Sequence, residues 1–271
     1  MHQLFQTLSV VPEGWRIPFY GAGLVALLLA GLATANRFAL WARGKDQANV
    51  LEGKGAASLL WLSLTRLFSS DCLFAVRVFV RSRLRGFMLL FIVWSVLLMA
   101  AGVLLSAIQA AFGFTIASGR SGLYLSLLMD VAGGFLLAGL LVALARRYVF
   151  RPERWMSIMA DAVVMNLFTA VVLMGFILEG ARLAALPWAV AKWTPVGYAT
   201  GHLMVRIPGV DAAALIAAYP VAYLIHALLA FLLIAYFPFS KLFHLFAAQV
   251  TLFAAVEEGR GISWKRLSMS R

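Results

Sequence analysis

The sequence is poor in cysteine, histidine and acidic side chains. Of its 271 residues, one is cysteine, four are histidine and 11 are Asp or Glu. The single cysteine, Cys72, excludes an intrachain disulfide and any zinc or iron–sulfur site built from this chain's own cysteines. Only 13% of the residues are charged, about half the usual share of a soluble domain. A soluble fold, which needs a polar surface, is therefore excluded.

Apolar residues are unusually abundant in the chain. They make up 63% of the chain, and the mean hydropathy is +0.91. Five apolar stretches are long enough to cross about 30 Å of hydrocarbon, near residues 17–41, 86–112, 122–145, 160–181 and 213–239. Backbone polar groups in lipid must be satisfied within the segment, which favours helices. The sequence predicts an all-α membrane protein with five transmembrane helices in residues 1–250 and a short cytoplasmic tail in 251–271.

The positive charge is unevenly distributed. The net charge is +12, which in a soluble protein would suggest nucleic acid as a partner. Here 18 Lys and Arg residues fall beside the first and third connections and in the tail, and five fall on the opposite side. Because basic residues collect on the cytoplasmic side, the N-terminus is expected outside and the C-terminus in the cytoplasm of a cell inner (cytoplasmic) membrane. No nucleic-acid partner is expected. The arginine-rich stretch over 55–86 is expected to contact membrane lipid phosphates or a cytoplasmic partner.

Two histidines stand out because ionisable side chains at membrane depth are costly and often functional. His226 lies well inside the fifth apolar stretch, and His244 near its cytoplasmic end. On one continuous helix, 18 residues place both imidazoles on one face, about 27 Å apart. They are too far apart to share a metal ion, but each could be an axial ligand of haem iron. Glycines of the third stretch, Gly133, Gly134 and Gly139, offer room for a porphyrin. The alternative is a histidine that packs against a neighbouring helix, or that is solvated.

Several stretches resemble one membrane family. "FPFSKLFHLF", with a histidine eighteen residues upstream, resembles the last helix of the gamma subunit of respiratory nitrate reductase. It is also similar to the cytochrome b subunits of heterodisulfide reductase and of the membrane complex linked to dissimilatory sulfite reductase. "RSRLRGFMLLFIVWS" resembles the entry to the second helix, and "LLMDVAGGFLLAGLLVALARRYVFRP" resembles the third helix. "GFILEGARLAA", followed by "WTPVGYA", resembles the fourth helix and the outer loop after it, which also holds His202. The resemblance covers roughly residues 17–250.

The resemblance implies a membrane electron-transfer subunit of a hetero-oligomeric complex of anaerobic respiration. Such a subunit passes electrons between a membrane quinone, such as menaquinone, and a cytoplasmic iron–sulfur subunit through two b haems. In the family, each haem takes one histidine from the second helix and one from the fifth. His226 would serve the haem near the outer face, and His244 the haem near the cytoplasm. The chain would not catalyse a reaction alone, because it has no cysteine cluster for the other half-reaction.

The chain departs from the family pattern in its second helix. The positions of the family's second-helix histidines fall on Leu89 and Met99, and no histidine lies between His2 and His202. Leu89 has no donor atom, whereas the thioether of Met99 is a known haem ligand type. The open alternatives are one heme b on His226 with or without Met99, haems held by one histidine each, and a haem-free anchor that shapes a quinone pocket. An unrelated small transporter is disfavoured by the absence of an inverted repeat.

A few charged side chains lie near the outer ends of the stretches. Glu179 and Arg182 are three residues apart and are expected to pair along one helix. Because quinol oxidation near the outer face releases protons, Glu179 or His202 is a candidate proton acceptor. An interfacial ion pair with no further role is the alternative.

Overall fold

The chain forms a bundle of long helices. The computed structural model describes residues 13–43, 61, 76–113, 119–150, 159–184, 193–240 and 243. All regular elements in these ranges are helical. Five helices are long and apolar enough to cross a membrane, as the sequence predicted: α2 (Glu13–Arg43), α6 (Arg83–Phe112), α7 (Gly119–Tyr148), α8 (Met159–Leu183) and α11 (Ala212–Tyr236). The protein is therefore a multi-pass membrane protein.

Three short elements join the long helices: α5 (Val76–Arg81), α10 (Pro195–Met204) and the 3₁₀ segment η2 (Phe237–Phe239). Of the arginine-rich stretch over 55–86, the structure describes residue 61, α5 and the start of α6; the rest lies outside the described residues. The sequence interpretation treated α10 as a loop. Its start nevertheless carries a recognisable signal, because Thr194 precedes a proline at the first helical position.

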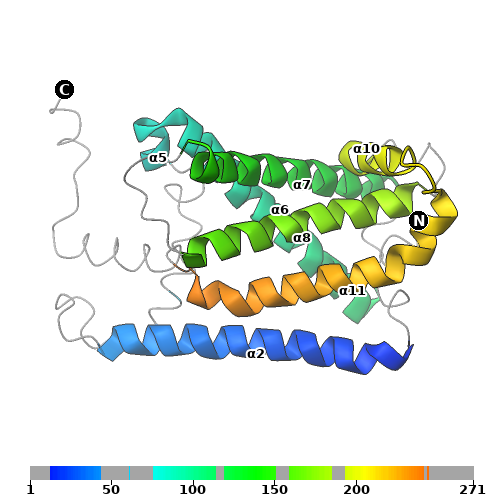
Figure 1. The fold of residues 1–271 in the computed structure, drawn as a ribbon. Helices are drawn as coiled ribbons and strands as arrows, with labels where there is room; N and C mark the ends of the chain where they lie inside the picture. The colour runs from blue at the N-terminus through cyan, green and yellow to red at the C-terminus, as the bar shows by residue number, and fades with distance from the viewer. Residues whose placement is uncertain are drawn as a thin grey trace.

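The buried core lies between α7 and α8, which are stacked in Figure 1 with α6 passing behind them. It is built from Leu136 and Leu140 of α7 with Val172 and Phe176 of α8. Side chains of α6 extend this core through Ile92. These residues are apolar and closely packed, so the core holds α6, α7 and α8 together as one unit.

The glycines expected to leave room for a porphyrin are instead filled by neighbouring side chains. A Cβ on Gly133 would lie 3.0 Å from the ring of Phe176, and a Cβ on Gly139 would lie 2.8 Å from Ile92. Gly134 faces Val196 in the same way, at 3.3 Å. The expectation that these three glycines leave space for a porphyrin was therefore wrong, because Gly133, Gly134 and Gly139 face α8, α10 and α6 respectively and allow close helix packing on each side.

The helices α2, α6 and α11 present large apolar side chains outward. Leu32 of α2 is 69% exposed, Val103 of α6 is 71% exposed and Val221 of α11 is 62% exposed. In water such a surface would be strongly unfavourable, but in a bilayer it meets lipid chains of the same polarity. Aliphatic side chains on this surface therefore support the membrane environment that the composition predicted.

The fifth span ends earlier than a continuous helix through His244 requires. α11 ends at Tyr236, η2 follows, and Ser240 has extended backbone angles of φ −90° and ψ 167°. Pro238 explains the break, because it has no N–H group to continue the helix. The expectation of one continuous helix through both His226 and His244 was therefore wrong, because the helix is interrupted before residue 241. Residue 244 itself lies outside the described part of the chain.

The short helix α10 crosses α8 with backbone against backbone. A Cβ on Gly180 would lie 2.7 Å from the amide nitrogen of Gly201, and a Cβ on Gly201 would lie 2.5 Å from the carbonyl oxygen of Gly180. Only glycine at both positions permits this approach, which is a common way for helices to pack in membranes.

Asp130 of α7 fixes the first turn of α10. Its two carboxylate oxygens accept hydrogen bonds from the backbone N–H groups of Val196 and Gly197, each at 2.8 Å. Thr194, at the N-cap position, makes no such bond with its side chain. Asp130 is only 2% exposed, so its negative charge is compensated by these two donors and by the positive end of the helix dipole. The hydrogen bonds of Asp130 thus hold α10 to α7, and the close contact between Gly180 and Gly201 packs α10 against α8.

Replacing Gly201 by Val is expected to separate α10 from α8. The new side chain collides with backbone atoms of Gly180 that cannot rotate away, so the midpoint temperature of unfolding in detergent should fall. Gly21→Ala is the matched control, because a Cβ at Gly21 meets nothing within 4 Å. A Gly201→Val protein as heat-stable as the control would contradict the described crossing.

Replacing Asp130 by Ala is expected to leave two buried N–H groups without partners. Such groups cost about 1–3 kcal/mol each, so the substitution should destabilise the protein strongly. Asp211→Asn is the control, because Asp211 caps α11 from an exposed position through the N–H of Ala214, and Asn caps helices equally well. Thermal unfolding of the two variants in detergent measures the difference, and equal stability would exclude Asp130 as the cap of α10.

Candidate functional site

His226, the histidine expected at membrane depth, lies on α11 and faces α8. Its Cε1 atom is 3.5 Å from the position that a Cβ on Gly175 would occupy, and the ring lies near the backbone of Val171. Its Nδ1 atom is buried and has no hydrogen-bond partner within the described ranges. A buried imidazole nitrogen without a partner is costly unless a ligand or a metal satisfies it. This arrangement makes His226 a candidate ligand.

No described contact joins Met99, the predicted second ligand of the same haem, to His226. Met99 lies on α6, which packs against α7 and α5, whereas α11 packs against α8 and α2. The side chain of Met99 is 36% exposed and makes no described contact with the imidazole. Leu89 lies on the same helix and supplies no donor atom. The assignments of Met99 and His244 as ligands stay predictions, the latter because residue 244 is outside the described residues.

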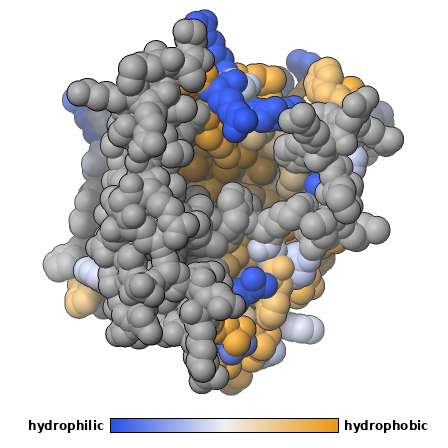
Figure 2. All heavy atoms as spheres, turned by 90° about the vertical axis from the view of Figure 1, so that its left-hand side faces the viewer, coloured by the Kyte–Doolittle hydropathy of each residue, from blue (hydrophilic) through white to orange (hydrophobic). Residues whose placement is uncertain are grey.

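The described donor set fits a haem with one histidine ligand in this part of the bundle. His226 supplies an unpartnered ring nitrogen, and within the described residues no three His, Cys, Asp or Glu side chains converge on one point. Figure 2 shows the bundle from the end where α7 ends and α8 begins, with a recess whose described wall is hydrophobic. Within the described residues, α6 offers no histidine that could pair with His226 on one haem.

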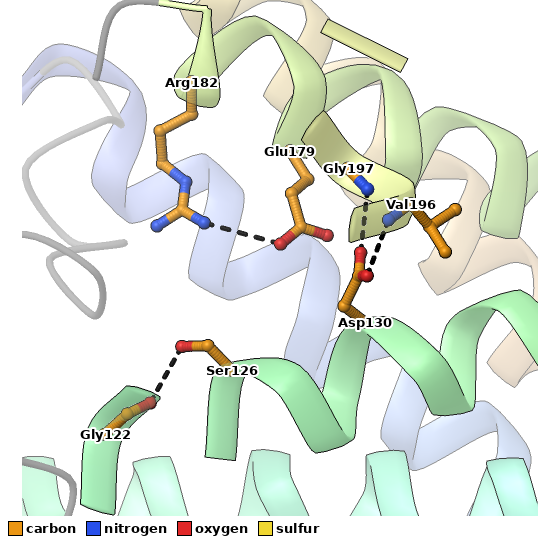
Figure 3. A network of polar contacts seen from close by, with 7 residues as sticks. All are labelled: Gly122, Ser126, Asp130, Glu179, Arg182, Val196 and Gly197. Carbon is orange, nitrogen blue, oxygen red and sulfur yellow. Dashed lines mark hydrogen bonds and ion pairs between the residues drawn. The ribbon is translucent and has the colours of Figure 1, made fainter. Parts of the chain in front are cut away.

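A second group of polar side chains gathers where α8 ends and α10 begins. Figure 3 shows Glu179 between Arg182 on the same helix and Asp130 on α7. Glu179 and Arg182 form the expected ion pair, with 3.6 Å between carboxylate oxygen and guanidinium nitrogen. The Cγ and Cδ atoms of Glu179 lie 2.6 and 2.8 Å from the position of a Cβ on Gly197, so any larger residue there would displace this carboxylate.

Tyr219 belongs to the same polar group and was missed from the sequence. It lies on α11, is partly buried and is close enough to interact electrostatically with both Arg182 and Glu179. The one available signal was a tyrosine repeated after one turn, Tyr219 and Tyr223, in an otherwise aliphatic run. We call Glu179, Arg182 and Tyr219 the polar cluster.

His202, the second candidate proton acceptor, shares no described contact with the polar cluster. It is exposed near the end of α10 and stacks on Tyr198, with 5.4 Å between ring centroids. No described contact joins it to Glu179 or Arg182. The polar cluster is therefore formed by α8 and α11, with α10 contributing backbone only.

Comparison with known proteins gives one family match and several relatives. The family model "Nitrate reductase gamma subunit" matches residues 94–256. The chain is 31% identical over 200 residues to a subunit of the dihydromethanophenazine:CoB–CoM heterodisulfide reductase of Methanosarcina barkeri, covering 71% of this chain and 66% of that protein. The corresponding subunit from Methanosarcina acetivorans is 28% identical over 249 residues, covering 87% of this chain and 82% of that protein.

A third relative is much longer than this chain. The EtfAB:quinone oxidoreductase of Syntrophomonas wolfei is 29% identical over 186 residues, which are 65% of this chain but only 26% of that protein. The chain thus spans about a quarter of this relative and just under two thirds of the Methanosarcina barkeri protein. No solved structure matches the chain. The family match covers more than half of the chain, from the middle of α6 through α11, so the chain belongs to the nitrate reductase gamma subunit family.

Proposed function

We propose that the chain is the membrane electron-transfer subunit of a redox complex in the cell inner membrane. It passes electrons between a membrane quinone and a cytoplasmic iron–sulfur subunit. The observation that carries this proposal is the family match together with His226, whose ring nitrogen is buried without a partner in an apolar bundle. Catalysis of the other half-reaction is left to the partner subunits.

The relatives support the coarse part of this proposal. One matched protein is named as an EtfAB:quinone oxidoreductase. Another is named as a subunit of a dihydromethanophenazine:CoB–CoM heterodisulfide reductase. The residues of this chain that the family model matches, 94–256, include the membrane-spanning helices α7, α8 and α11. A quinone is therefore the proposed electron carrier on the membrane side of this chain, and a hetero-oligomeric complex is its proposed setting.

His226 is the proposed axial ligand of a b-type haem. A bound haem supplies one-electron transfer at membrane depth. The protein's own contribution is to hold the imidazole against Gly175 and the backbone of Val171, with Nδ1 buried. His244 is proposed as the ligand of a second haem nearer the cytoplasm, and Met99 as a sixth ligand.

A haem-free anchor is the second candidate function. It is favoured by the absence of histidine from α6, where the resemblance places the second-helix histidines on Leu89 and Met99. In that case His226 would only pack against α8, and the chain would hold the complex in the membrane and shape its quinone pocket. The two candidates differ in a single measurable property, which is haem content.

The proposed orientation is testable with reporter fusions. We expect an N-terminus outside, because the connections assigned to the cytoplasm carry 18 of the 23 Lys and Arg residues. Alkaline phosphatase fused after Asp211 should be active, and fused after Arg151 it should be inactive. A green fluorescent protein fused at the same two positions should give the reverse pattern, and any other pattern would contradict the topology.

The proposed ligand is testable by absorption spectroscopy of the purified complex. Adding menadiol, a soluble naphthoquinol, to the oxidised complex should produce the α-band of a reduced b haem. His226→Ala should lose at least part of this band, because its haem has no other histidine within the described membrane segments. His202→Ala is the control and should keep the full band. A band unchanged by His226→Ala, in a complex that still assembles, would exclude His226 as the ligand.

A further inference from the structure

The polar cluster at the α8–α11 seam has no role in the electron transfer proposed above. Glu179 and Arg182 are paired at 3.6 Å, and their side chains are 24% and 25% exposed. Both residues lie within the membrane span that covers Ala162–Leu183. Ionisable groups at this depth are costly, and those that stay partly accessible commonly belong to a substrate or proton pathway.

The charged groups at and around Glu179 carry one negative charge in excess, which one bound proton would neutralise. Asp130 and Glu179 contribute two negative charges, and Arg182 contributes one positive charge, so one negative charge is in excess. Asp130 already uses both oxygens to accept backbone N–H groups, and a proton there would break one of these bonds. Glu179 accepts no hydrogen bond within the described residues. A proton is therefore accommodated at Glu179 without the loss of a hydrogen bond, and it neutralises the excess charge.

Aromatic rings connect the cluster to the lipid-facing side of the bundle. Tyr223, one turn beyond Tyr219 on α11, stacks on Phe19 of α2 with 6.0 Å between centroids. Phe19 also contacts Tyr20 at 5.5 Å and Phe231 at 5.5 Å. A seam of flat rings between two lipid-facing helices suits a flat ring headgroup that arrives from the bilayer.

We propose that Glu179 accepts protons from the hydroxyl groups of a hydroquinone headgroup bound beside Arg182 and Tyr219. This inference rests on the proposed function. Each hydroquinone O–H bond breaks as its proton forms a new O–H bond on the Glu179 carboxylate, which releases the proton to water before it takes the second. The two electrons pass one at a time to a haem or iron–sulfur acceptor of the complex. Arg182 and Tyr219 donate hydrogen bonds to the quinone oxygens, and Asp130 is a positioning residue.

Within the described residues, Asp130 approaches Glu179 from α7, Arg182 from α8 itself and Tyr219 from α11. Tyr223 of α11 interacts electrostatically with Tyr219 and with Tyr20 of α2. On α10 the titratable groups are Tyr198 and His202, which stack on each other. Among the described residues, Glu179 combines a carboxylate with partial exposure and a direct cationic neighbour, whereas His202 has no described contact with Arg182, and this selects Glu179 as the proton acceptor.

Oxidation of menadiol by membranes that contain the complex tests this proposal, with a dye as the electron acceptor. Glu179→Gln should lower kcat about 100-fold, because general-base catalysis typically contributes 10²–10⁴-fold, while KM changes little. Glu179→Asp, which keeps a carboxylate, should restore part of kcat, and its rate should still fall as the pH is lowered. Asp211→Asn makes the same chemical change at the same end of the bundle and should leave the rate unchanged.

The outcomes separate this inference from the function on which it rests. A wild-type complex that oxidises no menadiol overturns the proposed function and the role of Glu179 with it. An active wild type together with an equally active Glu179→Gln complex overturns only the role of Glu179. If Glu179→Gln fails to assemble, infrared difference spectra of the wild type and Glu179→Asp decide. A carboxyl C=O band that forms on menadiol oxidation and shifts in the Asp variant supports the proposal, and the absence of such a band overturns it.

Discussion

The burial of the Asp130 carboxylate is the interaction on which the polar end of the bundle depends. A charge at membrane depth has to be compensated inside the protein, and Asp130 achieves this by binding two N–H groups at the start of α10. This bond sets where α10 begins. The contact between Gly180 and Gly201 then sets how closely α10 approaches α8. The hydrogen bonds of Asp130 and the glycine contact together place Gly197 against Glu179. The position of the Glu179–Arg182 pair therefore depends on the hydrogen bonds that Asp130 accepts.

The sequence was sufficient for the architecture because the bilayer imposes a simple rule. Each span needs about twenty apolar residues, and all five predicted stretches became helices close to their expected bounds. The pairing of Glu179 with Arg182 was also predictable, since residues three apart share a helical face. Local spacing along a single helix was enough for both predictions.

Other features could not be obtained from spacing along one segment. The cap of α10 joins Asp130 to Val196 and Gly197, which lie 66 and 67 positions further along the chain, and Tyr219 interacts electrostatically with Arg182 from another helix. The glycines of α7 looked like space for a porphyrin but meet Phe176, Val196 and Ile92, which only the packing of neighbouring helices reveals. The continuous fifth helix failed for a local reason that was visible in the sequence, the proline at 238. For the cap of α10 and for the glycines of α7, the residue that makes the contact lies far away in the sequence.

The two candidate sites lie at different positions along the same pair of helices. His226 presents a buried ring nitrogen from α11 toward α8, and the polar cluster joins the same two helices nearer the end of α8. Electron transfer needs the first kind of group, and proton exchange needs the second. α11 contributes a residue to both sites, His226 to one and Tyr219 to the other. A shift of α11 against α8 would therefore change both sites together.

The central claim, a subunit that carries electrons through haem, is tested most directly by the haem content of the purified complex. Haem b is measured as the pyridine haemochrome and divided by the amount of this chain. The account predicts at least one haem b per chain, and a value near two would mean that His244 also serves as a ligand. A complex that contains no haem b would contradict the account and leave the haem-free anchor as the function of this chain.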